Sequence, residues 1–253
     1  MKRFYKAAAA APAAATPAAA TPNTSADQGW HVTLDGRAVK TPGKRPLSLP
    51  TQALAQAIAQ EWAAQGDQVV PDTMPLTQYA CSALDRVAPA RDQVIHQVSA
   101  FAETDLIAYP AQTPPELRAR QDACWLPLIN QLAAMDWPLR QTSGLIAIEQ
   151  DASLRPRATA WLQAKSDMAL TALASLIEAS GSFFLPYLMA EQMMHRPADQ
   201  MAGRGISLDQ LIEACTLEEQ FNLQTWGNDE EAEQLLARRE ADLRSAAQML
   251  NLL

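Results

Sequence analysis

The amino-acid sequence predicts an α+β protein, in which a small N-terminal α/β domain is followed by a larger all-α domain. Residues 29–75 hold alternating apolar and polar segments around Asp35 and Gly36, a pair that favours a two-residue type I′ hairpin turn. From residue 76 onward the apolar residues instead recur every three or four positions, which is the period of an amphipathic helix. We therefore expect a β-hairpin sheet with one helix at residues 29–75, and helices alone at residues 76–253.

The small domain begins with the two arms of the hairpin at residues 30–41, which place Val32 opposite Val39. A further short extended segment at residues 46–50 precedes Thr51, whose hydroxyl is a good N-cap for a helix. Apolar residues repeat every fourth position along that helix, at Leu54, Ile58 and Trp62. This helix is therefore expected to pack on the hairpin.

Residues 1–28 are expected to form an N-terminal segment and an Ala/Pro-rich linker. The charged start followed by alanines superficially resembles a signal peptide. However, Pro12, Pro17 and Pro22 interrupt any continuous apolar helix, and alanine is barely hydrophobic. We interpret residues 7–28 as a semi-extended, low-complexity linker.

Prolines and capping residues mark where the helices of the larger domain are expected to begin and end. Pro89 separates the first two predicted helices, and Pro127 is expected to kink or divide the third. Ser207 is a good N-cap for a helix at residues 208–215. The last helix is expected to begin near Asp229, with acidic residues in its first turns, where the helix dipole favours them. The apolar side chains that it is expected to bury are Leu236, Leu243, Ala247 and Leu250.

Composition excludes several classes of protein. Twenty Lys and Arg against 28 Asp and Glu give a formal net charge of −8, so no basic field exists to bind nucleic acid or an anionic membrane. No apolar run is long enough for stable membrane insertion. Cys81, Cys124 and Cys215 are odd in number and far apart, which favours free core thiols in a reducing compartment. We expect a cytoplasmic protein.

The sequence carries no recognisable catalytic or metal-binding pattern. His31, His96 and His195 lack a metal-ligand spacing, and the sequence contains neither a phosphate-binding glycine loop nor a GxSxG nucleophile elbow. We expect no cofactor, no metal and no catalytic residues, and therefore a binding protein rather than an enzyme. Two alternatives stay open: an enzyme that uses carboxylates for acid/base chemistry in a helical cleft, and a scaffold that self-associates through its helical domain.

A series of short motifs runs in order along nearly the whole chain. The motifs include KRFYK at 2–6, LDGRAVKTP at 34–42, LPT at 49–51, EW at 61–62, MPLT at 74–77, ExF at 219–221 and WGxDxEA at 226–232. In order and spacing they resemble the ATP-twelve family, also known as F(1)-ATPase assembly factor 2. Pro110 and Leu126 depart from that family's pattern, which has Arg and Asp at these places.

The resemblance implies a fold and a function. The family's fold is a small N-terminal α/β domain with a larger helical domain, which agrees with the pattern of the residues. The implied function is that of a molecular chaperone for assembly of the F-type ATP synthase head. Such a chaperone binds the free ATP synthase alpha subunit and prevents its aggregation until the beta subunit replaces it. We expect a monomer in the bacterial cytoplasm, as relatives act there or in the mitochondrial matrix.

The resemblance also implies a set of partner-binding residues. These are Glu219, Phe221, Trp226, Asp229 and Glu231. For Glu219 the alternative is that its carboxylate braces the following helix, and for Trp226 the pattern favours a ring buried where a helix ends at Gly227. Asp105 and Gln121 lie in apolar stripes, where either a buried hydrogen-bonded network or a contact with the partner accounts for them.

Overall fold

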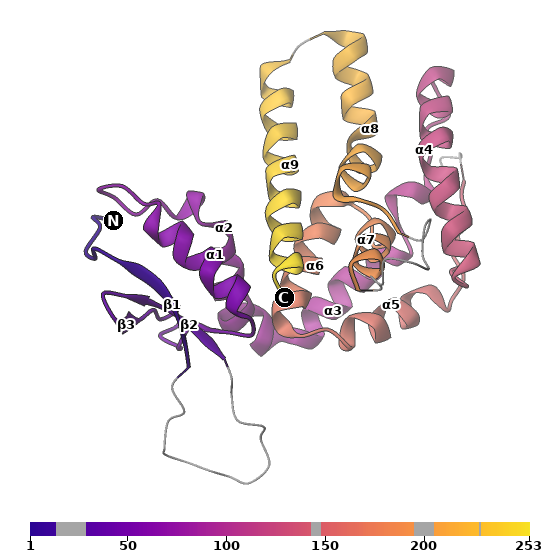
Figure 1. Cartoon of the computed structure of the whole chain (residues 1–253). Coiled ribbons are helices and arrows are strands. Elements are labelled where there is room, and N and C mark those ends of the chain that lie inside the picture. Colours follow the sequence, from indigo (N-terminus) through magenta and orange to yellow (C-terminus); the bar gives the residue numbers. More distant parts are fainter. Residues whose placement is uncertain (14–28, 143–147, 195–204, 228) are drawn as a thin grey trace, which may run out of the picture. The chain divides into compact units, whose positions relative to one another are not determined.

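The structure is a computed structural model of the 253-residue chain, and it describes residues 1–13, 29–142, 148–194, 205–227 and 229–253 (Figure 1). A small antiparallel sheet precedes a series of helices, which confirms the α+β fold class. The chain forms two compact units. Unit 1 comprises Met1–Arg91, Ser166–Ala172 and Gln248–Leu253, and unit 2 comprises Asp92–Lys165 and Leu173–Ala247.

The unit boundaries differ from the expected boundary at residue 75. Unit 1 extends to Arg91 and also takes in short stretches of two later helices. The reason is that Met168, Ala172 and Met249 are buried in the same apolar core as the sheet. Sequence periodicity marks where helices begin, but it does not show which core a helix end joins.

The sheet of unit 1 has one central strand. Its strands are β1 (Ala8–Pro12), β2 (Trp30–Leu34), β3 (Arg37–Ala38) and β4 (Ser48–Leu49). β2 pairs antiparallel with each of the other three strands. Asp35 and Gly36 join β2 to β3 with φ angles of 48° and 79°, as a type I′ turn requires, so the predicted hairpin is confirmed.

β1 corrects the predicted extent of the linker. We expected residues 7–28 to be a linker, but Ala8–Pro12 pairs with the whole length of β2, with Ala10 opposite Val32. The backbone N–H and C=O groups of β2 supply the hydrogen-bond partners for this strand. Because alanine has a low β-propensity of its own, no sequence pattern predicted the strand. Residues 14–28 of the predicted linker lie outside the described residues.

The helix α1 (Gln52–Ala63) packs against this sheet (Figure 1). Thr51 caps it as predicted, because its Oγ1 accepts a hydrogen bond from the Leu54 N–H at 3.1 Å. The same hydroxyl donates to the carbonyl oxygen of Leu252 at 2.5 Å, which ties the C-terminal residues into unit 1. The largest fully buried side chains of this core include Leu47, Leu49, Leu54, Ile58 and Leu76.

The remaining elements of unit 1 follow α1. They are a 3₁₀ turn (Pro71–Thr73), α2 (Pro75–Ser82), a π-helical turn (Ala83–Val87) and a second 3₁₀ turn (Ala88–Ala90). The carboxylate of Glu61 on α1 accepts hydrogen bonds from the N–H groups of Leu76 and Thr77, at 2.7 and 2.8 Å. It thereby caps the N-terminus of α2, where the helix dipole favours a negative charge.

Unit 2 consists of helices in the part that the structure describes. They are α3 (Arg91–Ser99), 3₁₀ turns at Ala100–Ala102 and Leu106–Ala108, α4 (Pro115–Ala134), α5 (Leu154–Gln163), α6 (Asp167–Ser180), α7 (Phe184–Met194), α8 (Leu208–Trp226) and α9 (Glu230–Asn251). The first residue of α3, the start of α6 up to Ala172 and the end of α9 from Gln248 belong to unit 1. Pro127 lies inside α4 without dividing it. Ser207 caps α8 as predicted, in a capping box with Gln210.

An aromatic cluster and one buried acid organise the core of unit 2. The cluster comprises Trp137, Trp161, Phe183, Phe184 and Tyr187, whose ring centroids lie 5.1 to 6.0 Å apart. Asp105 is fully buried, and its Oδ2 accepts hydrogen bonds from the N–H groups of Phe183 and Phe184 at 2.7 and 3.0 Å. Burial raises the pKa of Asp105 to about 6, while those hydrogen bonds oppose the shift.

Within the described residues, no helix has the length and apolar character that crossing a bilayer requires. The same residues contain no group of three or more His, Cys, Asp or Glu side chains placed to hold a metal ion.

Candidate functional site

A groove lies between the C-terminal half of α8 and the N-terminal half of α9. α8 contributes Glu219, Asn222, Leu223 and Trp226, and α9 contributes Ala232, Leu235, Leu236 and Arg239. On each helix these four positions follow the spacing i, i+3, i+4, i+7, which is one face of a helix. The groove has a volume of about 320 Å³ and is completed at one end by Gly227 and Asp229.

The two helices end and begin sharply beside the groove. α8 stops at Gly227, which has a φ of 90° that side-chain-bearing residues rarely adopt. α9 starts directly after Asp229, whose Oδ1 accepts hydrogen bonds from the N–H groups of Glu231 and Ala232 at 3.0 and 3.3 Å. The predicted start of the last helix is therefore confirmed, and Asp229 is its N-cap.

Large apolar side chains stand exposed at the rim of the groove. Trp226 is 83% exposed and Leu235 is 68% exposed. The sequence pattern favoured a buried Trp226 ring, and this interpretation was wrong, because α8 ends at that turn and no described residue covers the ring. Leu236 also departs from expectation, since it is half-buried in the groove instead of packed in the core.

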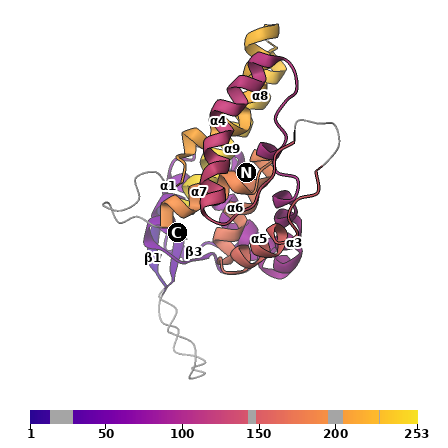
Figure 2. The same ribbon diagram turned by 90° about the vertical axis from the view of Figure 1, so that its right-hand side faces the viewer.

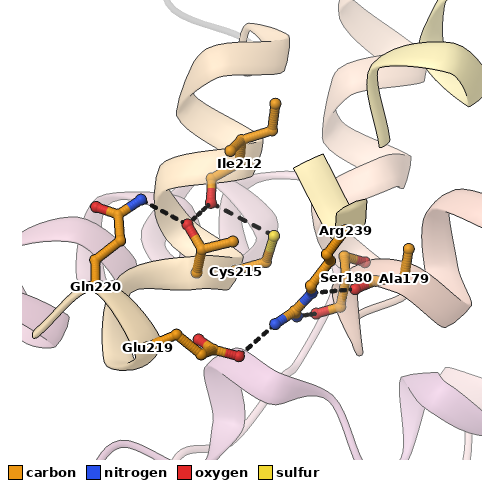
Figure 3. A network of polar contacts seen from close by, with 8 residues as sticks. Ala179, Ser180, Ile212, Cys215, Glu219, Gln220 and Arg239 are labelled. Carbon is orange, nitrogen blue, oxygen red and sulfur yellow. Dashed lines mark hydrogen bonds and ion pairs between the residues drawn. The ribbon is translucent and has the colours of Figure 1, made fainter. Parts of the chain in front are cut away.

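An ion pair between Glu219 of α8 and Arg239 of α9 bridges the groove (Figure 3). The Arg239 guanidinium also donates to two carbonyl oxygens at the C-terminal end of α6, those of Ala179 at 2.6 Å and Ser180 at 3.2 Å. The C-terminal dipole of α6 stabilises a cation there. Arg239 is thus held firmly, whereas the Glu219 side chain is 48% exposed. Its carboxylate braces α9 and still faces solvent.

A second hollow of about 200 Å³ adjoins the groove and shares Glu219, Asn222 and Arg239 with it. Leu106, Trp125 and Ala214 also line it, and the Trp125 Nε1–H donates to the Ala214 carbonyl oxygen at 2.9 Å. Cys215 also borders this hollow, and burial raises the pKa of its thiol to about 11. The thiol is therefore protonated at neutral pH, which leaves it a poor nucleophile.

The opposite side of α8 packs on α4, which crosses it in Figure 2. Phe221 is 7% exposed and packs in this seam with Leu117 and Leu217. Arg120 of α4 lies over the Phe221 ring, with 5.1 Å between its Cζ and the ring centroid. Gln121 is fully buried and accepts a hydrogen bond from the Ala111 N–H at 2.6 Å. Asp105 therefore belongs to a buried hydrogen-bonded network, which was one of the two open interpretations. Gln121 is buried in the same way, but only its Oε1 has a hydrogen-bond partner among the described residues, and its Nε2 has none.

The structure brings together three of the five sequence-predicted site residues. Glu219, Trp226 and Asp229 line the groove, Phe221 lies in the seam with α4, and Glu231 is exposed in the first turn of α9 without lining the groove. Sequence reasoning missed Leu223, Ala232, Leu235 and Arg239. The available signal was the i, i+3, i+4, i+7 spacing at residues 219–226 and 232–239. The helix expected at residues 208–215 stops short of the first stretch, and of the second only Leu236 was expected to be buried.

One family model and three solved structures resemble this chain. A family model described as ATP12 chaperone protein matches residues 2–133. The crystal structure of Atp12 from Paracoccus denitrificans is 32% identical, with a TM-score of 0.84, and covers 99% of this chain and 97% of that chain. A mutant of the same protein matches with equal values. The Atu1473 protein of Agrobacterium tumefaciens is 28% identical, with a TM-score of 0.83, and covers 98% of this chain and 85% of that chain.

Proposed function

The chain belongs to the ATP12 chaperone family, and on that premise we propose that it binds the free alpha subunit of the F-type ATP synthase during assembly of the catalytic head. The observation that carries the proposal is the open apolar groove between α8 and α9, with Trp226 exposed at its rim. Exposed apolar patches on soluble proteins mark interaction surfaces. The proposed role requires binding alone and no catalytic step.

The chemistry of the groove suits a protein client. An isolated subunit exposes apolar surface that its neighbour later covers, and such surface drives aggregation. Tryptophan and leucine side chains at the groove supply apolar contact area, and tryptophan is enriched among the residues that dominate binding energy. The half-exposed Glu219 carboxylate supplies a charge at the end of the groove away from Gly227, which favours correct orientation of a basic group on the client.

The size of the groove fits a temporary complex. A cavity of about 320 Å³ accommodates a few side chains of the client. Temporary complexes bury less surface area than permanent subunit interfaces do. A chaperone that contacts the alpha subunit through such a site yields to the beta subunit by mass action once the larger contact forms. This exchange needs no ATP.

Co-expression tests the proposal. The alpha subunit is produced alone, with this chain, or with its Trp226→Ala or Glu219→Lys variant, and the soluble alpha subunit that co-purifies is measured. We expect a soluble complex with the unaltered chain and its loss with both variants. Leu126→Ala is the matched control, since Leu126 is 42% exposed on α4 and does not line the groove. An alpha subunit that stays insoluble with the unaltered, folded chain overturns the proposal.

A further inference from the structure

The groove has the form of a helical pair that lacks a third helix. Each of its walls presents the i, i+3, i+4, i+7 face of one helix. The apolar side chains of these faces are Leu223 and Trp226 on α8, and Ala232, Leu235 and Leu236 on α9. In a helical bundle two such faces are covered by a third helix. Among the described residues no element covers them, and Leu235 is accordingly 68% exposed.

We propose that the groove binds one amphipathic α-helix of its protein partner, with an apolar stripe flanked by lysines or arginines. This inference rests on the proposed function, because it specifies what the client inserts. The bound helix places apolar side chains at i, i+3, i+4 and i+7 between Trp226 and Leu235, as in other helix-in-groove complexes. The exposed Trp226 ring packs over it as the principal anchor.

The negative charge of the residues around the groove favours binding of a basic helix. Residues 213–239 contain seven Asp and Glu and two Arg, so their formal charge is −5. The Arg239 charge is engaged by Glu219 and by the carbonyl oxygens of Ala179 and Ser180. Three further carboxylates are exposed beside the groove face, namely Glu218, Glu231 and Glu233, each of which adjoins a groove-lining residue in the sequence. Complementary charge steers a partner to its site and excludes partners of like charge, so an acidic helix is rejected.

A helix fits these walls better than an extended segment does. An extended peptide gains affinity by main-chain hydrogen bonds to a free sheet edge, whereas the groove is built from two helices whose backbone groups are already paired. Recognition here must therefore rest on side chains. A helix presents apolar side chains on one face and charges on the others, which matches an apolar floor between acidic flanks.

Fluorescence anisotropy with designed peptides tests this inference on the full chain. The probe is a labelled peptide of about 18 residues, long enough to form a helix on binding, with leucines at i, i+3, i+4 and i+7 and lysines elsewhere. Three comparison peptides are a scrambled form, a form with glutamate for lysine, and a form with a central proline that breaks the helix. We expect binding of the first peptide alone, with a gain of helical circular dichroism and weaker binding at high salt.

Variants of the chain locate the binding site. Trp226→Ala and Leu235→Lys are each expected to weaken binding of the basic peptide at least about tenfold, and Leu126→Ala to leave it unchanged. Equal binding of the scrambled or proline peptide, or no loss in the two groove variants, overturns the inference. The proposed function is tested separately. A soluble alpha-subunit complex without peptide selectivity refutes only the inference that the groove binds a helix. Peptide binding without any alpha-subunit complex refutes only the proposal that the alpha subunit is the client.

Discussion

Reversal of the charge at Glu219 separates two roles of one carboxylate. In the structure Glu219 pairs with Arg239, so a Glu219→Lys variant removes this bridge between α8 and α9 and places two cations side by side. The carboxylate is also half-exposed at the groove, where we propose that the client's basic group approaches. The first role concerns the stability of the folded chain, and the second concerns only binding.

The effect on stability is expected to be small. Ion pairs at exposed positions contribute about 0 to 1 kcal/mol, and the Glu219 and Arg239 side chains are 48% and 24% exposed. Two like charges about 4 Å apart repel by about 1 kcal/mol where water screens them. Glu219→Lys therefore costs about 1 to 2 kcal/mol, a minor part of the roughly 5 to 15 kcal/mol that stabilise a folded protein. The variant is expected to stay folded.

Urea unfolding and alpha-subunit capture, measured on the same preparations, separate these effects. We expect Glu219→Lys to lose at least about tenfold in affinity for the alpha subunit while its unfolding free energy falls by about 1 to 2 kcal/mol. Glu219→Gln is the control, since it removes the charge without adding repulsion, and an intermediate loss of affinity is expected. A variant that unfolds, or one that captures the alpha subunit as well as the unaltered chain does, refutes this reasoning.

Three further predictions concern the residues that hold the fold. Burial raises the pKa of Asp105 to about 6, whereas an unfolded aspartate titrates near about 3.9. The folded chain therefore binds this proton more tightly, and the stability contributed by the group falls by about 1 kcal/mol between about pH 5 and pH 7. Urea unfolding at both pH values should show that Asp105→Asn abolishes this slope, and an unchanged slope contradicts the assignment. Glu61→Ala leaves the N–H groups of Leu76 and Thr77 without their acceptor, and it should lower the free energy of unfolding in urea by about 2 kcal/mol. An unchanged free energy of unfolding would show that water replaces the cap. Ser207→Ala removes the capping box of α8 and should lower the unfolding free energy by about 1 kcal/mol, with faster amide exchange in the first turn of α8; unaltered exchange there would show that the cap is dispensable.

Local features of the fold were predictable from the sequence because their signals are local. The turn at Asp35 and Gly36 needs two positive φ angles, and few residue pairs provide them. The caps at Thr51, Ser207 and Asp229 each join a side chain to an N–H group two or three residues away. Both partners of each of these interactions therefore lie within one short stretch of the sequence.

Features that depend on distant partners were not predictable in this way. Ala8–Pro12 forms a strand because β2 lies beside it, since an alanine run has no strand pattern of its own. Glu61 caps α2 across 15 residues of sequence, and no motif connects the two. Trp226 and Leu235 follow the same helical period as core residues, and only the arrangement of α8 and α9 shows that their stripes border an open groove.

Site-specific photo-crosslinking to the alpha subunit tests the central claim most directly, namely that the groove between α8 and α9 is where the chain holds its client. A photoreactive amino acid replaces Leu235 in the groove or, as the control, Leu126 on α4, and each chain is co-expressed with the alpha subunit and irradiated. The account predicts an adduct with the alpha subunit from position 235 and none from position 126. An adduct from position 126 alone, or from neither position while a soluble complex still forms, contradicts it.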